Sequence, residues 1–596
     1  MNARKVVIYQ LVVRYFSNQN SANRFAGTLE ENGSGKFADI NELAVQALKD
    51  LGVTHVWLTG CLRQATLTDY SALGLPADDP DTVKGRAGSF YAVRDYFDVS
   101  PDYALEPANR LAEFEALVAR LHAAQLKVLI DLVPNHVARS YHSVIRPDLD
   151  FGAGDDTTRF FARDNSFFYL VDPPGRRTVI TRPRSWNPPG VVFDGLVPTE
   201  DGAPGRPPKA TGDNMTSPEV GPDRWYETVK LNYGFNFDNL ATEYEPRPRT
   251  WTLMNEVIAY WQGKGVDGFR CDFSHFVPAE FWRYLLTEAR LRNPDAYFVA
   301  EAYPWEGSRD PIQRMNQLID AGFDSVYDDA AYNLLKRIYL SSARQEDYDQ
   351  TILDSPVERP RLLQYLENHD ERRIASPLVY DPDAHHSGFG SAAAGYQLAP
   401  LQYLQSRGPI NFYNGQEVGE TGAGLKGYNQ DDGRTTLFDY WHMPELGRWV
   451  NGHRYDGGQS TEEERALRNF YRDLLHLCQD ESALAEGRWG LKYYNRPERF
   501  ADCPADLFSF ARYGAGSGRM MVVAANFRGG ASIEGRLRLP NELIAAAGLP
   551  ARVRVRIVLR RAACDELVAE LDSAALATEG FGFAIPVQSS AVYIVS

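Results

Sequence analysis

The sequence has few cysteines, and their positions suggest neither disulfide bridges nor a metal site. Five occur among 596 residues, an odd number without the paired spacing of metal ligands. They are Cys61, Cys271, Cys478, Cys503 and Cys564. We therefore expect reduced thiols, which are typical of the cytoplasm.

Long apolar runs are also missing. No run approaches the roughly 18 to 20 residues that a membrane-spanning helix needs. The apolar N-terminal stretch is broken by Gln10 and Arg14, and no small-residue cleavage site follows it. A buried strand is a better interpretation than a signal peptide, so the sequence predicts a cytoplasmic protein without membrane contact.

Positive charge is in deficit. The chain carries 63 Lys and Arg against 79 Asp and Glu, a formal net charge of -16. The summed field would repel phosphate, which argues against nucleic acid or an anionic membrane as a partner. No glycine-rich phosphate loop stands out, so a phosphate-dependent reaction is disfavoured, although ordinary loop amides remain able to bind phosphate. A neutral substrate meets no such barrier.

What the sequence does contain is an alternation of apolar strands and amphipathic helices. Apolar residues recur at helical spacing from about Ala38 to a stop at Gly52, and again over 111–121. The strand-like runs are 6–13, 53–58, 127–131, 268–272, 297–301, 323–327, 361–366 and 409–413. This order predicts an α/β chain with a (β/α)8 TIM barrel.

One long stretch interrupts the alternation after the third strand. Proline and glycine cluster at 172–176 and 204–208. Because a structureless loop of this length is implausible inside a compact domain, we expect a small inserted domain. Its predicted bounds are 137–240, which divide the barrel into residues 1–136 and 241–484.

The pattern changes again after a predicted helix at 462–477. Short runs with alternating apolar residues follow at 507–513, 520–527 and 552–558. Such runs predict an antiparallel β-sandwich, which we place at 485–596.

Polar residues close four of the predicted strands. The segments are Asp131-Leu-Val-Pro-Asn135-His136, Gly268-Phe-Arg270-Cys-Asp272, Ala300-Glu301 and Asn368-His369-Asp370. The carboxyl ends of parallel barrel strands converge on one rim, where such barrels carry out chemistry. Taken singly, each motif fits a helix cap or a turn. Four of them in order at separate strand ends favour a catalytic site.

The three carboxylates Asp272, Glu301 and Asp370 fit the cleavage of an acetal by double displacement, which needs an attacking carboxylate and a protonated carboxyl. Arg270 shares a strand face with Asp272 and should lower its pKa, which makes Asp272 the predicted nucleophile. Neighbouring carboxylates should raise the pKa of Glu301, as a general acid requires. Asp370 would stay ionised. Asp131 is expected to hold the site in shape by bonding Arg270.

With these motifs, the chain resembles glycoside hydrolase family 13, the α-amylase family, across nearly its whole length. The matching segments are 131–136, 268–272, 299–301 and 367–370, supported by Tyr91-Ala-Val-Arg-Asp-Tyr96 and Tyr413-Asn-Gly-Gln-Glu417. The resemblance implies a retaining mechanism on α-glucosidic bonds, with Asp272 as nucleophile, Glu301 as acid/base and Asp370 as transition-state stabiliser.

The resemblance also implies that four residues line the subsite of the attacked glucose, with Tyr91 stacking on its ring. They are Tyr91, His136, Arg270 and His369. It further assigns the insert as domain B and the tail as domain C.

The chain departs from the family pattern at several positions. His275 and Phe276 replace a frequent Lys-His pair, so the family's contacts to the leaving-group sugar and its aglycone preference are not carried over. His275 is kept as a predicted substrate-binding residue. Lys230 stands where many relatives carry an acidic residue. Because calcium needs oxygen ligands and negative charge, a lysine there disfavours it, although Asn135 remains a possible ligand. We expect no required cofactor and no metal.

The leading functional hypothesis is a cytoplasmic enzyme that hydrolyses α-1,4-glucosidic bonds in maltooligosaccharides or starch-like glucans. The alternative is a glucanotransferase or maltosyltransferase, in which a sugar acceptor replaces water at the covalent intermediate. A non-catalytic amylase-like partner is a third hypothesis, which has no need of the three carboxylates. The sequence leaves endo or exo action and the oligomeric state open.

Overall fold

The structure is a computed structural model. It describes residues 4–171, 179–180, 207–214, 216, 219–220, 225–237, 239–303, 311–377, 388–427 and 431–596. Among these residues, no helix combines the length and apolar character needed to span a bilayer.

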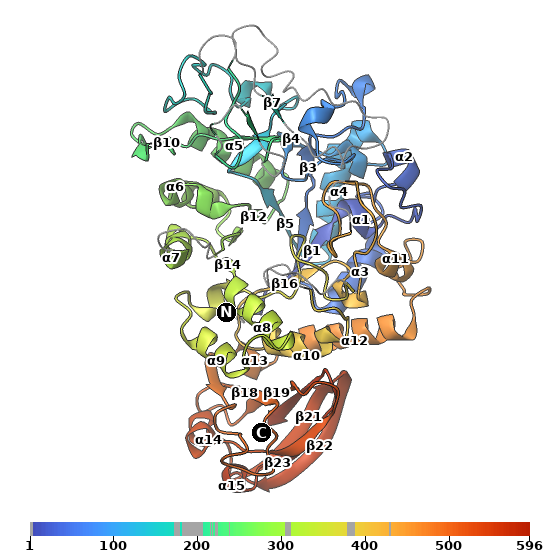
Figure 1. The fold of residues 1–596 in the computed structure, drawn as a ribbon, viewed down its shortest axis with the longest axis vertical. Coiled ribbons are helices and arrows are strands. Elements are labelled where there is room, and N and C mark those ends of the chain that lie inside the picture. Colours follow the sequence, from blue (N-terminus) through green and yellow to red (C-terminus); the bar gives the residue numbers. More distant parts are fainter. Residues whose placement is uncertain are drawn as a thin grey trace.

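Eight parallel strands form the predicted barrel (Figure 1). In spatial order they are β15 (Leu362–Leu363), β14 (Ser325–Tyr327), β13 (Tyr297–Ala300), β12 (Gly268–Cys271), β5 (Lys127–Leu132), β2 (His55–Thr59), β1 (Val7–Val12) and β16 (Ile410–Tyr413). A parallel bridge between Gln364 and Ile410 joins the first of these strands to the last. Every residue of β1 is buried, as expected for a parallel strand covered on both faces.

Helices surround the barrel, and local sequence explains where they begin and end. Helix α3 (Glu42–Leu51) begins after Asn41, whose side chain accepts hydrogen bonds from the first-turn amides, and ends at Gly52 with φ 99°. The others that cover the barrel include α4 (Arg110–Ala123), α5 (Arg249–Gly263), α6 (Ala279–Arg292), α7 (Pro311–Ala321), α8 (Asp329–Tyr339), α9 (Glu346–Leu353), α10 (Ala394–Tyr403) and α12 (Glu462–Leu477).

The seventh strand is shorter than the predicted run at 361–366. Leu362 and Leu363 form β15, Gln364 makes the bridge to Ile410, and the chain then leaves the sheet. Beyond the strand, the side chain of Asn368 accepts hydrogen bonds from the amides of Asp370 and Glu371 in a turn.

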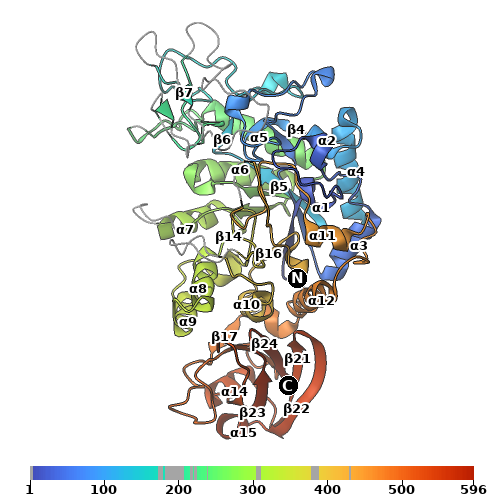
Figure 2. The ribbon, with the colours of Figure 1, turned by 45° about the vertical axis from the view of Figure 1, so that its right-hand side comes forward.

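The stretch predicted as an insert leaves the barrel after β5. Strand β6 (His136–Ala138) pairs antiparallel with β9 (Thr228–Lys230), and β10 (Phe235–Asn236) pairs with β11 (Ala241–Thr242). The predicted proline cluster at 172–176 and the first three residues of the cluster at 204–208 lie outside the described residues. In both views β7 (Val179–Ile180), which belongs to this stretch, lies at the end of the molecule opposite the C-terminal strands (Figure 2).

The tail forms the predicted antiparallel β structure. Its larger sheet has six strands in the order β17 (Gly487–Gly490), β18 (Leu507–Tyr513), β19 (Met520–Asn526), β24 (Ser590–Val595), β21 (Arg552–Arg560) and β22 (Ala562–Asp572). A second sheet pairs β20 (Ile533–Leu537) with β23 (Phe581–Ile585), and side chains from both sheets share one apolar core. The larger sheet lies against α10 and α12.

Candidate active site

Two of the predicted catalytic carboxylates lie on neighbouring strands. Asp272 directly follows β12 and Glu301 directly follows β13, and the last residues of these strands, Cys271 and Ala300, pair in register. Parallel pairing therefore brings both carboxylates to one point of the rim. The sequence prediction that these strand ends converge agrees with this arrangement.

A buried arginine lies between the two carboxylates. Arg270 Nη1 lies 2.6 Å from Asp272 Oδ1, and Nη2 lies 2.9 Å from Glu301 Oε1. The same guanidinium donates to Tyr327 Oη at 3.3 Å and has Asp131 Oδ1 at 3.6 Å. Arg270 thus holds both carboxyl groups in a fixed geometry, and the expected contact with Asp131 is present.

The pKa of Asp272 is raised, whereas the sequence predicted that Arg270 would lower it. Burial raises it well above its usual range, the nearby charge of Glu301 raises it further, and Arg270 only partly opposes them. The sequence shows the neighbouring arginine but does not show how far Asp272 is removed from solvent. The loss of solvation shifts the pKa more than the arginine does. Burial also raises the pKa of Asp131 to about 6.

Glu301 accepts two further hydrogen bonds. The backbone N–H of Phe273 donates to Glu301 Oε2 at 2.8 Å, and Tyr303 Oη donates to Oε1 at 3.1 Å. Phe273 has φ 40°, in the left-handed region that bulky residues rarely adopt. This backbone turn directs its amide toward Glu301.

His369 lies at the centre of a buried hydrogen-bond chain. The Gln10 amide donates to His369 Nδ1 at 2.7 Å, so the ring proton is on Nε2. Nε2 lies 2.5 Å from Tyr91 Oη and 3.1 Å from Asp370 Oδ2. Asn411 donates to Gln10 Oε1 at 3.2 Å and so orients the amide. Burial lowers the pKa of His369 to about 3, which keeps the ring neutral.

Asp370 is the most accessible of the three carboxylates. Its side chain is 42% exposed, against 3% for Asp272 and 2% for Glu301. Desolvation raises the pKa of Asp370, and the charges of Arg270 and Arg434 oppose this. Arg434 also donates to the Asp370 carbonyl at 3.4 Å.

His136 lies on the insert side of the rim, in β6. Its ring centroid is 5.2 Å from that of Trp225, and Trp225 packs on Phe273 at 4.8 Å. Burial lowers the pKa of His136 to about 3, so this ring is also neutral. The remaining predicted binding residue, His275, lies in the short helix η7 (Ser274–Phe276), next to Ser274, whose N–H donates to the Glu301 carbonyl at 3.1 Å.

A lysine binds Asn135, the residue considered as a calcium ligand. The Lys230 ammonium donates to Asn135 Oδ1 and to the Phe276 carbonyl at 3.4 Å. Asn135 Nδ2 donates to the Gly212 carbonyl at 2.9 Å. A buried ammonium on the amide oxygen of Asn135 does not suit a divalent cation. Within the described part of the chain, no three His, Cys, Asp or Glu side chains form a metal-binding group.

The loop from Gly60 to Tyr91 reaches the rim at two points. Tyr91 contacts His369, and Lys84 Nζ forms an ion pair with Glu227 Oε1 at 2.8 Å. That ion pair ties the loop to the end of the insert. Sequence reasoning missed Gln10, Trp225 and this ion pair, because no local pattern relates residues so far apart in the chain.

Comparison with known proteins identifies the family. The sequence model described as "Alpha amylase, catalytic domain" matches residues 19–463. The chain belongs to the alpha-amylase family. This agrees with the resemblance seen in the four strand-end motifs.

Individual relatives are distant. An alpha-amylase of Streptomyces lividans is 25% identical over 524 residues, which cover 81% of this chain and 50% of that protein. The chain therefore spans about half the length of this relative. An alpha-1,4-glucan:maltose-1-phosphate maltosyltransferase of Rhodospirillum rubrum is 36% identical over 89 residues, 15% of this chain and 12% of that protein. The crystal structure of an alpha-amylase from Lactobacillus plantarum aligns over 100% of this chain and 99% of that chain, with 18% identity and a TM-score of 0.57. This last likeness concerns the fold alone.

Proposed function

We propose that the protein is a retaining glycoside hydrolase that cleaves α-1,4-glucosidic bonds of maltooligosaccharides or starch-like glucans. The observation that carries the proposal is the single guanidinium of Arg270 in contact with both Asp272 and Glu301. Retaining enzymes need two carboxyl groups only about 5 Å apart. Two carboxylates in contact with one guanidinium are suited to that spacing.

The proposed reaction has two steps. Asp272 attacks the anomeric carbon as Glu301 delivers its proton to the leaving oxygen, which forms a glycosyl ester on Asp272 and releases the shortened glucan. Glu301 then takes a proton from water, whose oxygen attacks the anomeric carbon and frees Asp272. Glu301 ends protonated, as it began.

The reaction needs Asp272 ionised at the moment of attack. Burial and the charge of Glu301 raise the pKa of Asp272, so the contact with the Arg270 cation is what favours the ionised nucleophile. Asp370, which is more accessible, would bind sugar hydroxyls or stabilise positive charge on the attacked ring.

The neutral histidines complete the proposed glucose subsite. His369 carries its proton on Nε2, beside Tyr91 and Asp370, where it can donate to a sugar hydroxyl. His136 faces the same rim from the insert. Since the low pKa values of both rings keep them uncharged, their hydrogen bonding would not change across neutral pH.

Glycosyl transfer is a second candidate, supported by the low exposure of Asp272 and Glu301, which limits the access of water. The short match to a maltosyltransferase is consistent with it. Chromatography of the products from one pure maltooligosaccharide separates the two. We expect only shorter chains, and products longer than the input would mean transfer.

Two narrower proposals follow from the Lys230 contact and the cysteines. We propose that the enzyme needs no calcium at Asn135, because Lys230 Nζ already occupies the Asn135 amide oxygen as a hydrogen-bond donor. We propose a cytoplasmic location, because all five cysteines are free thiols. Nucleic acid is not a proposed partner, given the negative net charge.

A further inference from the structure

The two carboxyl oxygens of Glu301 have different partners. Oε1 lies 2.9 Å from the guanidinium Nη2 of Arg270 and accepts a hydrogen bond from the Tyr303 hydroxyl at 3.1 Å. Oε2 accepts a hydrogen bond from the backbone N–H of Phe273 at 2.8 Å. A carboxylate oxygen offers two lone pairs. Among the described residues, Oε1 therefore faces two positive groups and Oε2 accepts from one.

This difference decides which oxygen of Glu301 carries the proton when it acts as the acid. A proton on Oε1 would add a third positive hydrogen to an oxygen that already faces a cation and a hydroxyl. A proton on Oε2 shares that oxygen with the Phe273 amide and leaves the contacts at Oε1 intact. The carbonyl oxygen of a protonated carboxyl keeps partial negative charge, which the guanidinium stabilises. The geometry therefore favours the proton on Oε2.

Packing fixes Tyr303 beside Oε1. Its ring meets the ring of Tyr327 edge-on, with the centroids 5.8 Å apart and the planes at 87°. The Tyr327 hydroxyl accepts a hydrogen bond from Nε of Arg270 at 3.3 Å, so Tyr303, Tyr327 and Arg270 form one group around this oxygen. Burial and the charge of Glu301 raise the pKa of Tyr303 well above its usual value, so its hydroxyl keeps its proton and remains a donor.

The hydroxyl of Tyr303 is what links this residue to the acid. Within the described part of the chain, Glu301 is the one hydrogen-bond partner of that hydroxyl. A phenylalanine would fill nearly the same space and keep the contact with Tyr327, but it would leave Oε1 with one donor fewer. The hydrogen bond can therefore be removed while the packing is kept.

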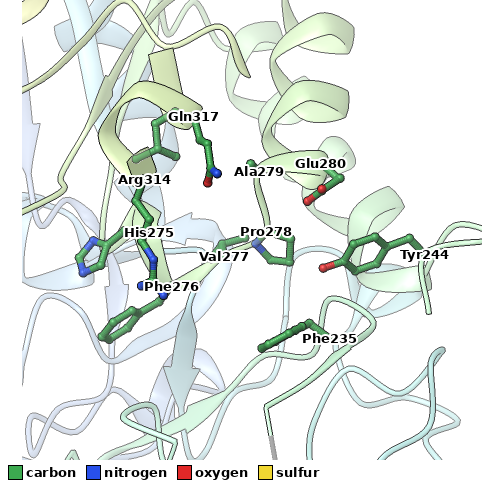
Figure 3. A pocket seen from close by; sticks show the side chains of 11 residues that line it. Phe235, Tyr244, His275, Phe276, Val277, Pro278, Ala279, Glu280, Arg314 and Gln317 are labelled. Carbon is green, nitrogen blue, oxygen red and sulfur yellow. The ribbon is translucent and has the colours of Figure 1, made fainter. Parts of the chain in front are cut away.

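The donor on the other oxygen does not allow such a test. Phe273 donates through its backbone, so a change of side chain leaves the donor in place. Its ring stacks on Phe276 at 5.3 Å, and Phe276 and His275 lie on one side of a pocket of about 220 Å³ between the start of α6 and the middle of α7 (Figure 3). A substitution at Phe273 would therefore also disturb the wall of this pocket.

We propose that Tyr303 is a positioning residue for the general acid: by donating to Oε1, it reserves Oε2 of Glu301 for the proton that the leaving oxygen receives. The inference rests on the proposed function. It gives a role to a side chain two residues beyond the acid, in addition to the three carboxylates and the proposed glucose subsite.

The test compares two substrates that differ in their need for a proton. Maltotriose loses a sugar oxygen that must be protonated, whereas α-maltosyl fluoride loses fluoride, which departs with little help from an acid. For both substrates, kcat/KM includes the attack of Asp272 and excludes the later reaction with water. The variant is Tyr303→Phe in the full-length chain. Its matched control is Tyr297→Phe, at the start of the same strand, where the hydroxyl lies 3.4 Å from Ser325 Oγ.

Loss of the hydroxyl should affect the two substrates unequally. Tyr303→Phe should lower kcat/KM for maltotriose roughly tenfold, because the proton of Glu301 is no longer confined to Oε2. For α-maltosyl fluoride, kcat/KM should change by about twofold at most, because that reaction depends little on the acid. Turnover of the fluoride also shows that the variant is folded. Tyr297→Phe should stay close to the wild type on both substrates.

The outcomes separate the two proposals. If the wild type cleaves no maltooligosaccharide, the proposed function is wrong and the inference falls with it. If the wild type is active and Tyr303→Phe loses activity equally on both substrates, Tyr303 supports the structure in general and the inference alone is wrong. An unchanged kcat/KM for maltotriose overturns it as well. A loss confined to maltotriose, and absent from Tyr297→Phe, supports it.

Discussion

The two ends of the barrel bury positive charge among different partners. At the N-terminal end, the Lys5 amine donates to three neutral oxygens of the described residues: Gln364 Oε1 at 2.9 Å, the Ser406 carbonyl at 2.7 Å and the Tyr403 carbonyl. At the rim, Arg270 lies among carboxylates. Lys5 is thus bonded by neutral amide and carbonyl oxygens, whereas Arg270 is paired with negatively charged side chains.

The difference separates a structural role from a chemical one. Lys5 has three acceptors and needs no further partner. At the rim, Asp272 Oδ2 is buried and accepts no hydrogen bond from any residue that the structure describes. An unsatisfied buried oxygen destabilises the fold, which is acceptable where that oxygen serves a reaction. Four predictions test this contrast.

Removing the Asp272 carboxylate at the rim should give the largest effect of the four changes, and that effect should be a loss of activity. Asp272→Asn should lower kcat by roughly 10⁴-fold or more, because no nucleophile remains. The variant should also gain stability relative to the wild type as pH rises from 4 to 7. The raised pKa of Asp272 means that its ionisation in the folded state becomes costly as pH increases. Product assays and thermal unfolding at several pH values measure both. Undiminished turnover would show that another residue is the nucleophile.

At the N-terminal end of the barrel, replacing Lys5 should change stability and leave activity unchanged. The contribution of Lys5 to the free energy of unfolding should rise with pH, whereas that of Asp272 falls. Burial lowers the pKa of Lys5 from 10.5 to about 7. The folded state therefore binds fewer protons than the unfolded state between these values, and Lys5 contributes a rise in the free energy of unfolding as pH increases. Relative to Lys5→Met, the wild type should gain on the order of 3 kcal/mol between pH 7 and pH 9.5. Denaturant unfolding checks this, and parallel curves for the two proteins would contradict the assigned burial.

Gln10 lies between the two ends, in β1, and should act on the rim by positioning His369. Gln10→Leu removes the donor to Nδ1 and allows the tautomer that lacks a proton on Nε2. We expect kcat/KM to fall roughly tenfold, as one misdirected hydrogen bond is worth about 1.4 kcal/mol. Steady-state kinetics measure the change, with Tyr493→Ala as the control, because Tyr493 is an exposed tyrosine of the C-terminal region, 57% accessible. Wild-type kinetics in Gln10→Leu would remove Gln10 from the site.

The smallest effect should follow removal of divalent metal. If Lys230 supplies the positive charge beside Asn135, a chelator should leave the Tm and the activity unchanged. Lys230→Asp replaces the ammonium with a carboxylate, and its Tm should rise when calcium is added. Thermal unfolding with and without calcium distinguishes the variants. A wild-type Tm that drops on chelation would contradict the proposal.

The sequence was sufficient for features that depend on local pattern. The barrel strands, the helix stop at Gly52 and the placement of Asp272 and Glu301 at strand ends follow from periodicity and turn residues. The shortened β15 did not follow, because an apolar run does not record where sheet pairing stops. The predicted domain bounds stay predictions.

Features that depend on burial or on distant contacts could not be obtained this way. The pKa of Asp272 was predicted in the wrong direction, because solvation lost on folding depends on packing that no local pattern records. The contact of Gln10 with His369 joins residues at opposite ends of the barrel sequence. Lys230 was singled out from sequence, but its bond to Asn135 required coordinates.

The most direct test of the central claim is to trap the covalent intermediate. A fluorinated α-glucosyl donor that forms the ester quickly and hydrolyses slowly is incubated with the full-length chain, and the digested protein is analysed by mass spectrometry. The account predicts one added glycosyl mass on the peptide that contains Asp272, and none in Asp272→Asn. Turnover of glucan without any adduct, or an adduct on a different carboxylate, would contradict it.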